Sequence, residues 1–74
     1  MRYFTYEDFD SPDVPGSGEA NMDIDFLAKL DEARHIAGIP FIINSGYRTQ
    51  SHNALIGGKT NSAHLRGYAA DIHE

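Results

Sequence analysis

The side chains best suited to chemistry lie in the stretch SAHLRGYAAD, residues 62–71. In it His64 and Asp71 are seven positions apart, with Gly67 between them. Zinc accepts imidazole nitrogen and carboxylate oxygen as ligands, and a catalytic zinc usually combines three such protein ligands with a water molecule. Glycine permits backbone paths that other residues avoid, so a reversal at Gly67 would let the two side chains converge. The pair therefore indicates two ligands of a metal site.

The same spacing has a simpler interpretation. Asp71 could form a salt bridge with Arg48 or Arg66, and one histidine near one aspartate is a common coincidence. From this spacing alone, both interpretations stay open.

A second stretch makes the metal interpretation more specific. Upstream of the pair, INSGYRTQSHN contains the segment Gly46-Tyr47-Arg48. The later stretch fits the pattern Ser-x-His-x-x-Gly-x-Ala-x-Asp, whose fixed positions are Ser62, His64, Gly67, Ala69 and Asp71. Through these two motifs, in this order, residues 3–73 resemble the zinc-dependent peptidases of the M15 family. That family includes D-alanyl-D-alanine carboxypeptidases and dipeptidases, and the L-alanyl-D-glutamate endolysins of phages.

The resemblance implies a set of site residues. It implies Zn²⁺ as the cofactor, His64 and Asp71 as metal ligands, and Ser62 as a contact to the bound peptide. It also implies that Arg48 is the active-site arginine. A guanidinium suits a substrate carboxylate or a developing oxyanion, because it is permanently charged and can donate two parallel hydrogen bonds. The implied substrate is the stem peptide of peptidoglycan, with the D-Ala-D-Ala and L-Ala-D-Glu bonds both open as the bond cleaved.

The resemblance also predicts what lies beyond the motif. Family members place a third zinc ligand, a histidine, well downstream of the aspartate, and a general-base carboxylate three residues before that histidine. The sequence stops at Glu74, so neither residue can be mapped onto it. We therefore expect residues 1–74 to be the N-terminal part of an M15-like peptidase domain. His73, on the same expected strand face as Asp71, is a candidate substitute ligand.

Two function hypotheses follow from these residues. The first is a zinc-dependent carboxypeptidase or endopeptidase that cleaves peptidoglycan stem peptides with a metal-activated water. The second is a truncated, non-catalytic remnant that binds a metal or a cell-wall peptide without turnover.

The first third of the chain is expected to supply a helical turn and a loop. Residues 3–9 predict the turn, with Thr5 and Asp8 forming a capping box. Residues 10–21 are rich in proline, glycine and serine, and they predict an irregular surface loop.

Residues 21–39 carry the clearest helical pattern. Asn21 or Asp23 can cap the start of this helix, and Gly38 suits its end. Its aspartates, Asp31 among them, are expected to lie on a solvated face.

The remaining elements must position the candidate site. Residues 41–45 predict a buried strand, and a short helix follows, capped by Thr49 or Ser51. Residues 59–64 predict a polar loop, and residues 67–73 predict a second strand. The expected fold is a small, single α+β domain with helices packed on a short, mostly antiparallel sheet. By resemblance, this is an incomplete M15 or hedgehog-like peptidase fold.

Composition limits the partners and the location. The net charge is −5, from 6 basic and 11 acidic residues, and the basic residues are scattered, so we expect no nucleic-acid partner. There are no cysteines, which excludes disulfides and thiolate ligands. The longest apolar run, GIPFII, is far too short to span a bilayer, so we expect no membrane partner. The N-terminus lacks the apolar region of a secretion signal. We expect synthesis in the cytoplasm and action at the cell wall after release. The exposed edge of the second strand predicts self-association.

Overall fold

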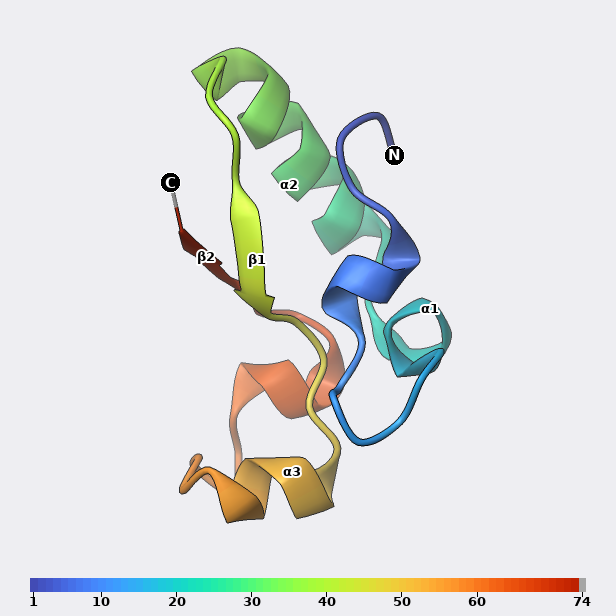
Figure 1. Ribbon diagram of the computed structural model, residues 1–74, viewed down its shortest axis with the longest axis vertical. Coiled ribbons are helices and arrows are strands. Elements are labelled where there is room, and N and C mark those ends of the chain that lie inside the picture. The colour runs from blue at the N-terminus through green and yellow to red at the C-terminus, as the bar shows by residue number, and fades with distance from the viewer. Residues whose placement is uncertain (74) are drawn as a thin grey trace.

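In the computed structural model, which describes residues 1–73, three helical elements precede the first strand and two more precede the second. With η marking 3₁₀ turns, the elements are η1 (Tyr6–Phe9), α1 (Ser17–Asn21), α2 (Ile24–Ala37), β1 (Ile42–Ser45), α3 (Gln50–Leu55), η2 (Ala63–Arg66) and β2 (Asp71–His73). Figure 1 shows α2 and the two strands toward one end of the molecule and α3 at the other. The arrangement confirms the predicted α+β class. None of the helices within residues 1–73 has the length and apolar character needed to cross a membrane.

Helix α2 begins and ends where local signals predict. The Asp23 carboxylate accepts the backbone N–H of Phe26 at 2.8 Å, which satisfies one of the free donors at the helix start. Gly38 ends the helix at a φ of 69°, a left-handed conformation that glycine adopts without strain. Asn21, the other predicted cap, is instead the last residue of α1.

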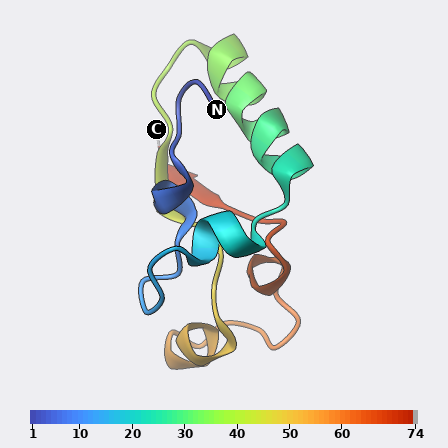
Figure 2. The same ribbon diagram turned by 90° about the vertical axis from the view of Figure 1, so that its right-hand side faces the viewer.

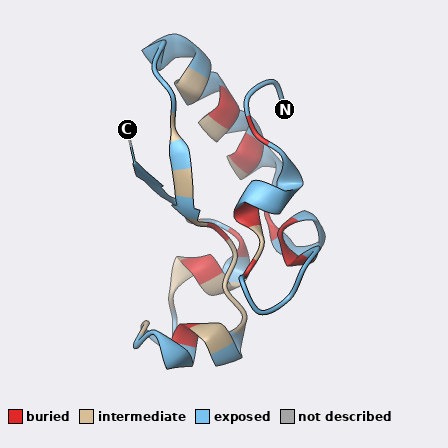
Figure 3. Cartoon of the chain, in the orientation of Figure 1, coloured by how far each residue is buried: buried red, intermediate tan, exposed pale blue. Residues whose placement is uncertain are grey.

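The apolar core is small and lies where η1 meets α2. It consists of Phe4, Phe9, Met22 and Leu27. The rings of Phe4 and Phe9 meet edge to face with centroids 5.7 Å apart, the arrangement that aromatic quadrupoles favour. Figure 3 shows further buried positions in α3 and η2, and these are the polar residues Asn53 and His64. That end of the molecule therefore buries polar side chains.

The sheet consists of β1 and β2, which pair antiparallel with Ile43 opposite Ile72 and Ser45 opposite Asp71. The pairing brings Asp71 beside the end of β1, directly before the Gly46-Tyr47-Arg48 segment. Along β1, exposed and half-buried residues alternate, so the prediction of a buried strand is wrong. A buried strand needs cover on both faces, and only one face of β1 has it within the described residues.

Each strand of this two-stranded sheet has one edge without a strand partner among residues 1–73. Such an edge is what the predicted self-association requires, and the association itself stays a prediction.

The predicted loop over residues 10–21 contains an element that the sequence did not indicate. Helix α1 occupies its second half, and the Asp10 carboxylate accepts the backbone N–H groups of Gly16 and Gly18 at 3.0 and 2.8 Å. The polar loop predicted over residues 59–64 likewise runs into η2. Both corrections have one cause, because side chains from neighbouring turns supply the hydrogen bonds that these short elements lack.

Asp31 is the clearest error among the predicted surface residues. It is 6% exposed, and its carboxylate accepts the backbone N–H groups of Arg2 and Tyr3 at 2.9–3.2 Å. Figures 1 and 2 both show the N-terminal segment alongside α2. Asp31 therefore fixes this segment to α2.

Candidate metal centre

His64 lies on η2, between a serine cap and a glycine stop. The Ser62 hydroxyl oxygen accepts the His64 backbone N–H at 3.3 Å. Gly67 ends the turn at a φ of 78°, so the predicted reversal of the chain is confirmed. A Cβ at Gly67 would collide with the Asn21 carbonyl oxygen, and the Gly67 carbonyl accepts the N–H of Asp23 at 3.0 Å. The reversal is therefore held against the start of α2.

The reversal brings the two predicted ligands together. His64 Nε2 lies 3.6 Å from Asp71 Oδ2. Two ligands of one tetrahedral zinc, each about 2.1 Å from the metal, would be roughly 3.4 Å apart. His64 Nδ1 lies 2.8 Å from the Gly46 carbonyl oxygen, which can only accept. The proton of a neutral imidazole is therefore on Nδ1, and the lone pair of Nε2 faces Asp71.

The donor set therefore fits zinc in type, separation and tautomer. The imidazole is 11% exposed and the Asp71 side chain 59% exposed, so the pair has one largely buried and one accessible partner.

Arg48 contacts the same carboxylate. Its guanidinium donates to Asp71 Oδ2 at 3.3 Å, to Ser45 Oγ at 3.2 Å and to Asn53 Oδ1 at 3.4 Å. The side chain is 14% exposed. The predicted salt bridge between Asp71 and Arg48 is therefore present. The same Asp71 oxygen, Oδ2, also lies near His64 Nε2. Arg66, the other suggested partner, is exposed and makes no ion pair with Asp71.

The backbone around Arg48 is held from two sides. Tyr47 N–H donates to the Phe9 carbonyl at 2.9 Å, and Arg48 N–H donates to the His64 carbonyl at 3.1 Å. A Cβ at Gly46 would lie 2.6 Å from the Phe9 Cα, so only glycine allows this approach. The two sequence motifs are therefore joined directly, through both the backbone and the His64 ring.

The remaining histidines lie elsewhere. His73 is exposed at the end of β2, opposite Ile42. Within residues 1–73, no group of three or more histidine, aspartate or glutamate side chains is arranged to hold a metal, so His73 does not join the pair. His35 contacts the Tyr3 hydroxyl at 2.7 Å, and the backbone N–H of His52 bonds to the Thr49 hydroxyl.

Sequence reasoning missed the residues that support Arg48. Ser45 and Asn53 both bind its guanidinium, and Asn53 is 3% exposed. The amide of Asn53 also donates to the Lys59 carbonyl at 2.8 Å, so both of its polar atoms have partners. A polar residue five positions after the arginine carried no signal of burial, because only the tertiary fold places it there.

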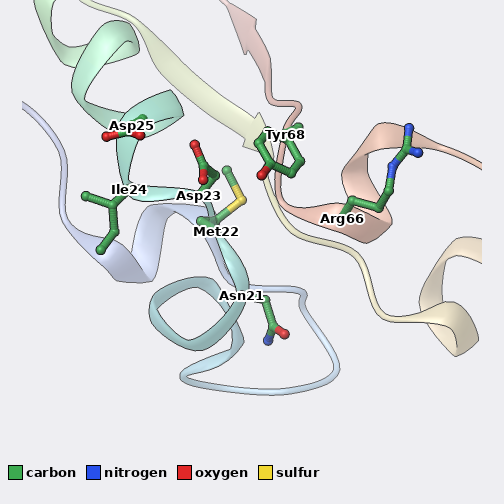
Figure 4. Close-up of a pocket in the computed structure, with 7 residues that line it drawn as sticks. All are labelled: Asn21, Met22, Asp23, Ile24, Asp25, Arg66 and Tyr68. Carbon is green, nitrogen blue, oxygen red and sulfur yellow. The ribbon is translucent and has the colours of Figure 1, made fainter.

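A pocket lies beside this centre and does not include it. It has a volume of about 550 Å³ and is lined by Asn21, Met22, Asp23, Ile24, Asp25, Arg66 and Tyr68. Figure 4 shows that these side chains come from two segments, the entry into α2 and the residues flanking Gly67. None of the predicted site residues lines it.

Comparison with known proteins defines the class. The sequence profile of the Peptidase M15 family matches residues 2–74, nearly the whole chain, and the chain belongs to this family. A segment of 45 residues is 42% identical to the zinc D-Ala-D-Ala carboxypeptidase of Streptomyces albus G. That segment covers 60% of this chain and 18% of the relative, so the chain spans only a small part of that protein. No solved structure matches the chain.

Proposed function

We propose that this chain provides part of the active site of a zinc-dependent peptidase, with His64 Nε2 and Asp71 Oδ2 as two of the metal ligands. The observation that carries the proposal is the 3.6 Å separation of these atoms, combined with the contact between His64 Nδ1 and the Gly46 carbonyl. Family membership and a relative named as a zinc carboxypeptidase support the same conclusion.

Each residue of the centre has a role in this proposal. Bound zinc would lower the pKa of a coordinated water to about 7 and polarise the scissile carbonyl. Arg48 lies at the Asp71 carboxylate, so its remaining donor capacity can bind a substrate carboxylate or the developing oxyanion. The Ser62 oxygen accepts from His64 N–H, which leaves its own O–H free to donate to a peptide carbonyl.

The family and the relative support a proposal for the substrate class. We propose that the peptide substrate is the stem peptide of peptidoglycan, cleaved as a carboxypeptidase or as an endopeptidase. The protein would then act at the cell wall after its release from the cell, as a bacterial or phage enzyme.

A complete site needs more donors than residues 1–73 bring together. With two ligands and no third donor in that part of the chain, zinc binding would be weak. By the family resemblance, the general base would also come from beyond Asp71. The catalytic proposal therefore requires a histidine and a carboxylate from further polypeptide. The same observation favours the alternative, a non-catalytic chain that binds a metal or a wall peptide.

The first test is a zinc titration of the purified chain by calorimetry, with three histidine variants. We expect His64→Ala to abolish saturable binding and His73→Ala to leave it unchanged. His35→Ala is the matched control, because it removes a histidine that lies on α2 and contacts Tyr3. Equal affinity in the parent and in His64→Ala would contradict the proposal.

The second test separates the two functions. Stem peptides ending in D-Ala-D-Ala, and peptides containing L-Ala-D-Glu, would be incubated with the zinc-loaded chain and analysed by mass spectrometry. Cleavage that disappears in His64→Ala supports the enzyme. Saturable zinc binding with intact peptides would reject catalysis by residues 1–74 alone, and it would support a binding role for this chain.

A further inference from the structure

We propose that Asp13 is a positioning residue for Arg48, acting through the hydroxyl groups of Ser11 and Thr49. This inference rests on the proposed role of Arg48 and adds a second segment, residues 11–13, to the site. The sequence placed these residues in a surface loop without a function. The structure brings them against the residue that follows Arg48.

The cluster is a closed set of hydrogen bonds. Asp13 Oδ1 accepts the Ser11 hydroxyl at 2.5 Å, and Asp13 Oδ2 accepts the Thr49 hydroxyl at 2.6 Å. Ser11 Oγ accepts the backbone N–H of Thr49 at 3.2 Å, and Thr49 Oγ1 accepts the backbone N–H of His52 at 3.1 Å. Ser11 is 1% exposed, so the Ser11 end of this set of hydrogen bonds is buried.

The carboxylate decides the direction of the other bonds. A hydroxyl has one proton to donate, and Asp13 takes that proton from both Ser11 and Thr49. Each hydroxyl oxygen is then available as an acceptor, one for Thr49 N–H and the other for His52 N–H. An ionised carboxylate only accepts, whereas an amide would offer one acceptor and one donor. The hydrogen bonds from Ser11 and then from Thr49 hold the pKa of Asp13 below its usual value, which keeps it ionised.

Two routes lead from this cluster to the guanidinium. The first is the backbone, because Tyr47 N–H and Thr49 N–H, on either side of Arg48, are bound to Phe9 and Ser11. The second is α3, which is capped by Thr49 and carries Asn53, the acceptor of Arg48 Nη1. If the cluster opens, the main chain beside Arg48 loses its hydrogen bond to Ser11, and the start of α3, which carries the buried acceptor Asn53, loses its cap. The guanidinium would then leave its defined position at Asp71.

The test is ¹⁵N NMR hydrogen exchange on the zinc-free chain. Asp13→Asn is compared with Asp25→Asn, the same change at an exposed residue with no side-chain hydrogen bond to residues 1–73. We expect Asp13→Asn to accelerate exchange of Thr49 N–H and of Arg48 Nε–H about tenfold or more, as expected for the loss of a hydrogen bond to a charged group. Exchange at Phe9 and Leu27 in the core should change less than about twofold. Asp25→Asn should change none of these rates.

A second pair of variants gives a conservative rescue. Thr49→Ser keeps the hydroxyl, so its exchange rates at Thr49 N–H and Arg48 Nε–H should equal those of the parent. Thr49→Val keeps the shape without the hydroxyl, so its rates should equal those of Asp13→Asn. This pair carries the test if Asp13→Asn does not fold. Unchanged exchange at Arg48 Nε–H, or equal acceleration at Arg48 and in the core, would overturn the inference. The measurement needs neither zinc nor substrate, so failure of the zinc titration would reject the proposed function and leave this result standing.

Discussion

Asp31 on α2 and Asp71 on β2 each pair with an arginine, and their surroundings differ. The Asp31 side chain is 9% exposed and accepts two backbone N–H groups besides its contact with Arg2. The Asp71 side chain is 59% exposed and shares one oxygen between His64 and Arg48. The Asp31 carboxylate, which stabilises the fold, already accepts hydrogen bonds from the backbone. The carboxylate at the candidate centre keeps capacity for a further cation, as its proposed role as a metal ligand requires.

The comparison predicts the largest loss of stability at Asp31. Asp31→Ala leaves the N–H groups of Arg2 and Tyr3 without their acceptor, and we expect the free energy of unfolding to fall by about 2 kcal/mol. Glu32→Ala is the matched control, because Glu32 pairs with the same arginine at the surface, and it should cost less than about 1 kcal/mol. Urea denaturation measures both. Similar losses from the two variants would contradict the distinction.

Asp71→Ala should change zinc affinity more than it changes stability. Asp71 is the exposed partner of its ion pair, and Arg48 keeps Ser45 and Asn53 as acceptors, so the free energy of unfolding should change by less than about 1 kcal/mol. Zinc affinity should fall at least about tenfold, because loss of even a residue that only hydrogen-bonds a metal ligand typically costs that much. Calorimetric titration of Asp71→Ala beside Asp31→Ala checks this. A variant at Asp71 that loses stability but keeps its zinc affinity would assign Asp71 to the fold.

The smallest expected effect is the pH dependence that Asp31 contributes. Burial raises the pKa of Asp31, but the hydrogen bonds from Tyr3 N–H and Arg2 N–H outweigh it and leave the pKa below its usual value. A carboxyl group with a lowered folded-state pKa contributes stability above its unfolded pKa of about 3.9, and this contribution disappears as the pH falls through the folded pKa.

Asp31→Asn removes this titration. The difference in the free energy of unfolding between pH 7 and pH 3 should therefore be smaller in Asp31→Asn than in the parent. Urea midpoints at the two pH values measure it. Equal differences in the two proteins would show that the Asp31 hydrogen bonds do not favour the ionised form.

Local signals in the sequence predicted the helix ends well. Thr5 and Asp8 form the predicted capping box, and Asp23, Gly38 and Thr49 act as the sequence suggested. These signals work because the donor and the acceptor are a few residues apart. The same reasoning did not predict the burial of Asp31, because its hydrogen-bond partners lie 28 and 29 positions away along the chain.

The same difference between local signals and long-range contacts applies to the candidate site. The motifs identified His64, Asp71 and Arg48, and the structure brings their side chains together, while their roles as ligands and as active-site arginine stay predictions. Asn53 and Asp13 were not predicted as supports of Arg48. Their contacts arise from the packing of α3 and of the segment before α1 against the Gly46-Tyr47-Arg48 stretch, and neither residue belongs to a local pattern.

The most direct test of the central claim is the ¹⁵N shift of the imidazole nitrogens during zinc addition, recorded by long-range NMR correlation. The account predicts that His64 Nε2 shifts first and that the proton on Nδ1 stays at the Gly46 carbonyl. His35 should not shift, and Asp71→Ala should weaken the response at His64. A shift that begins at His73 or His52, or that involves His64 Nδ1, would contradict the pairing of His64 Nε2 with Asp71 as metal ligands.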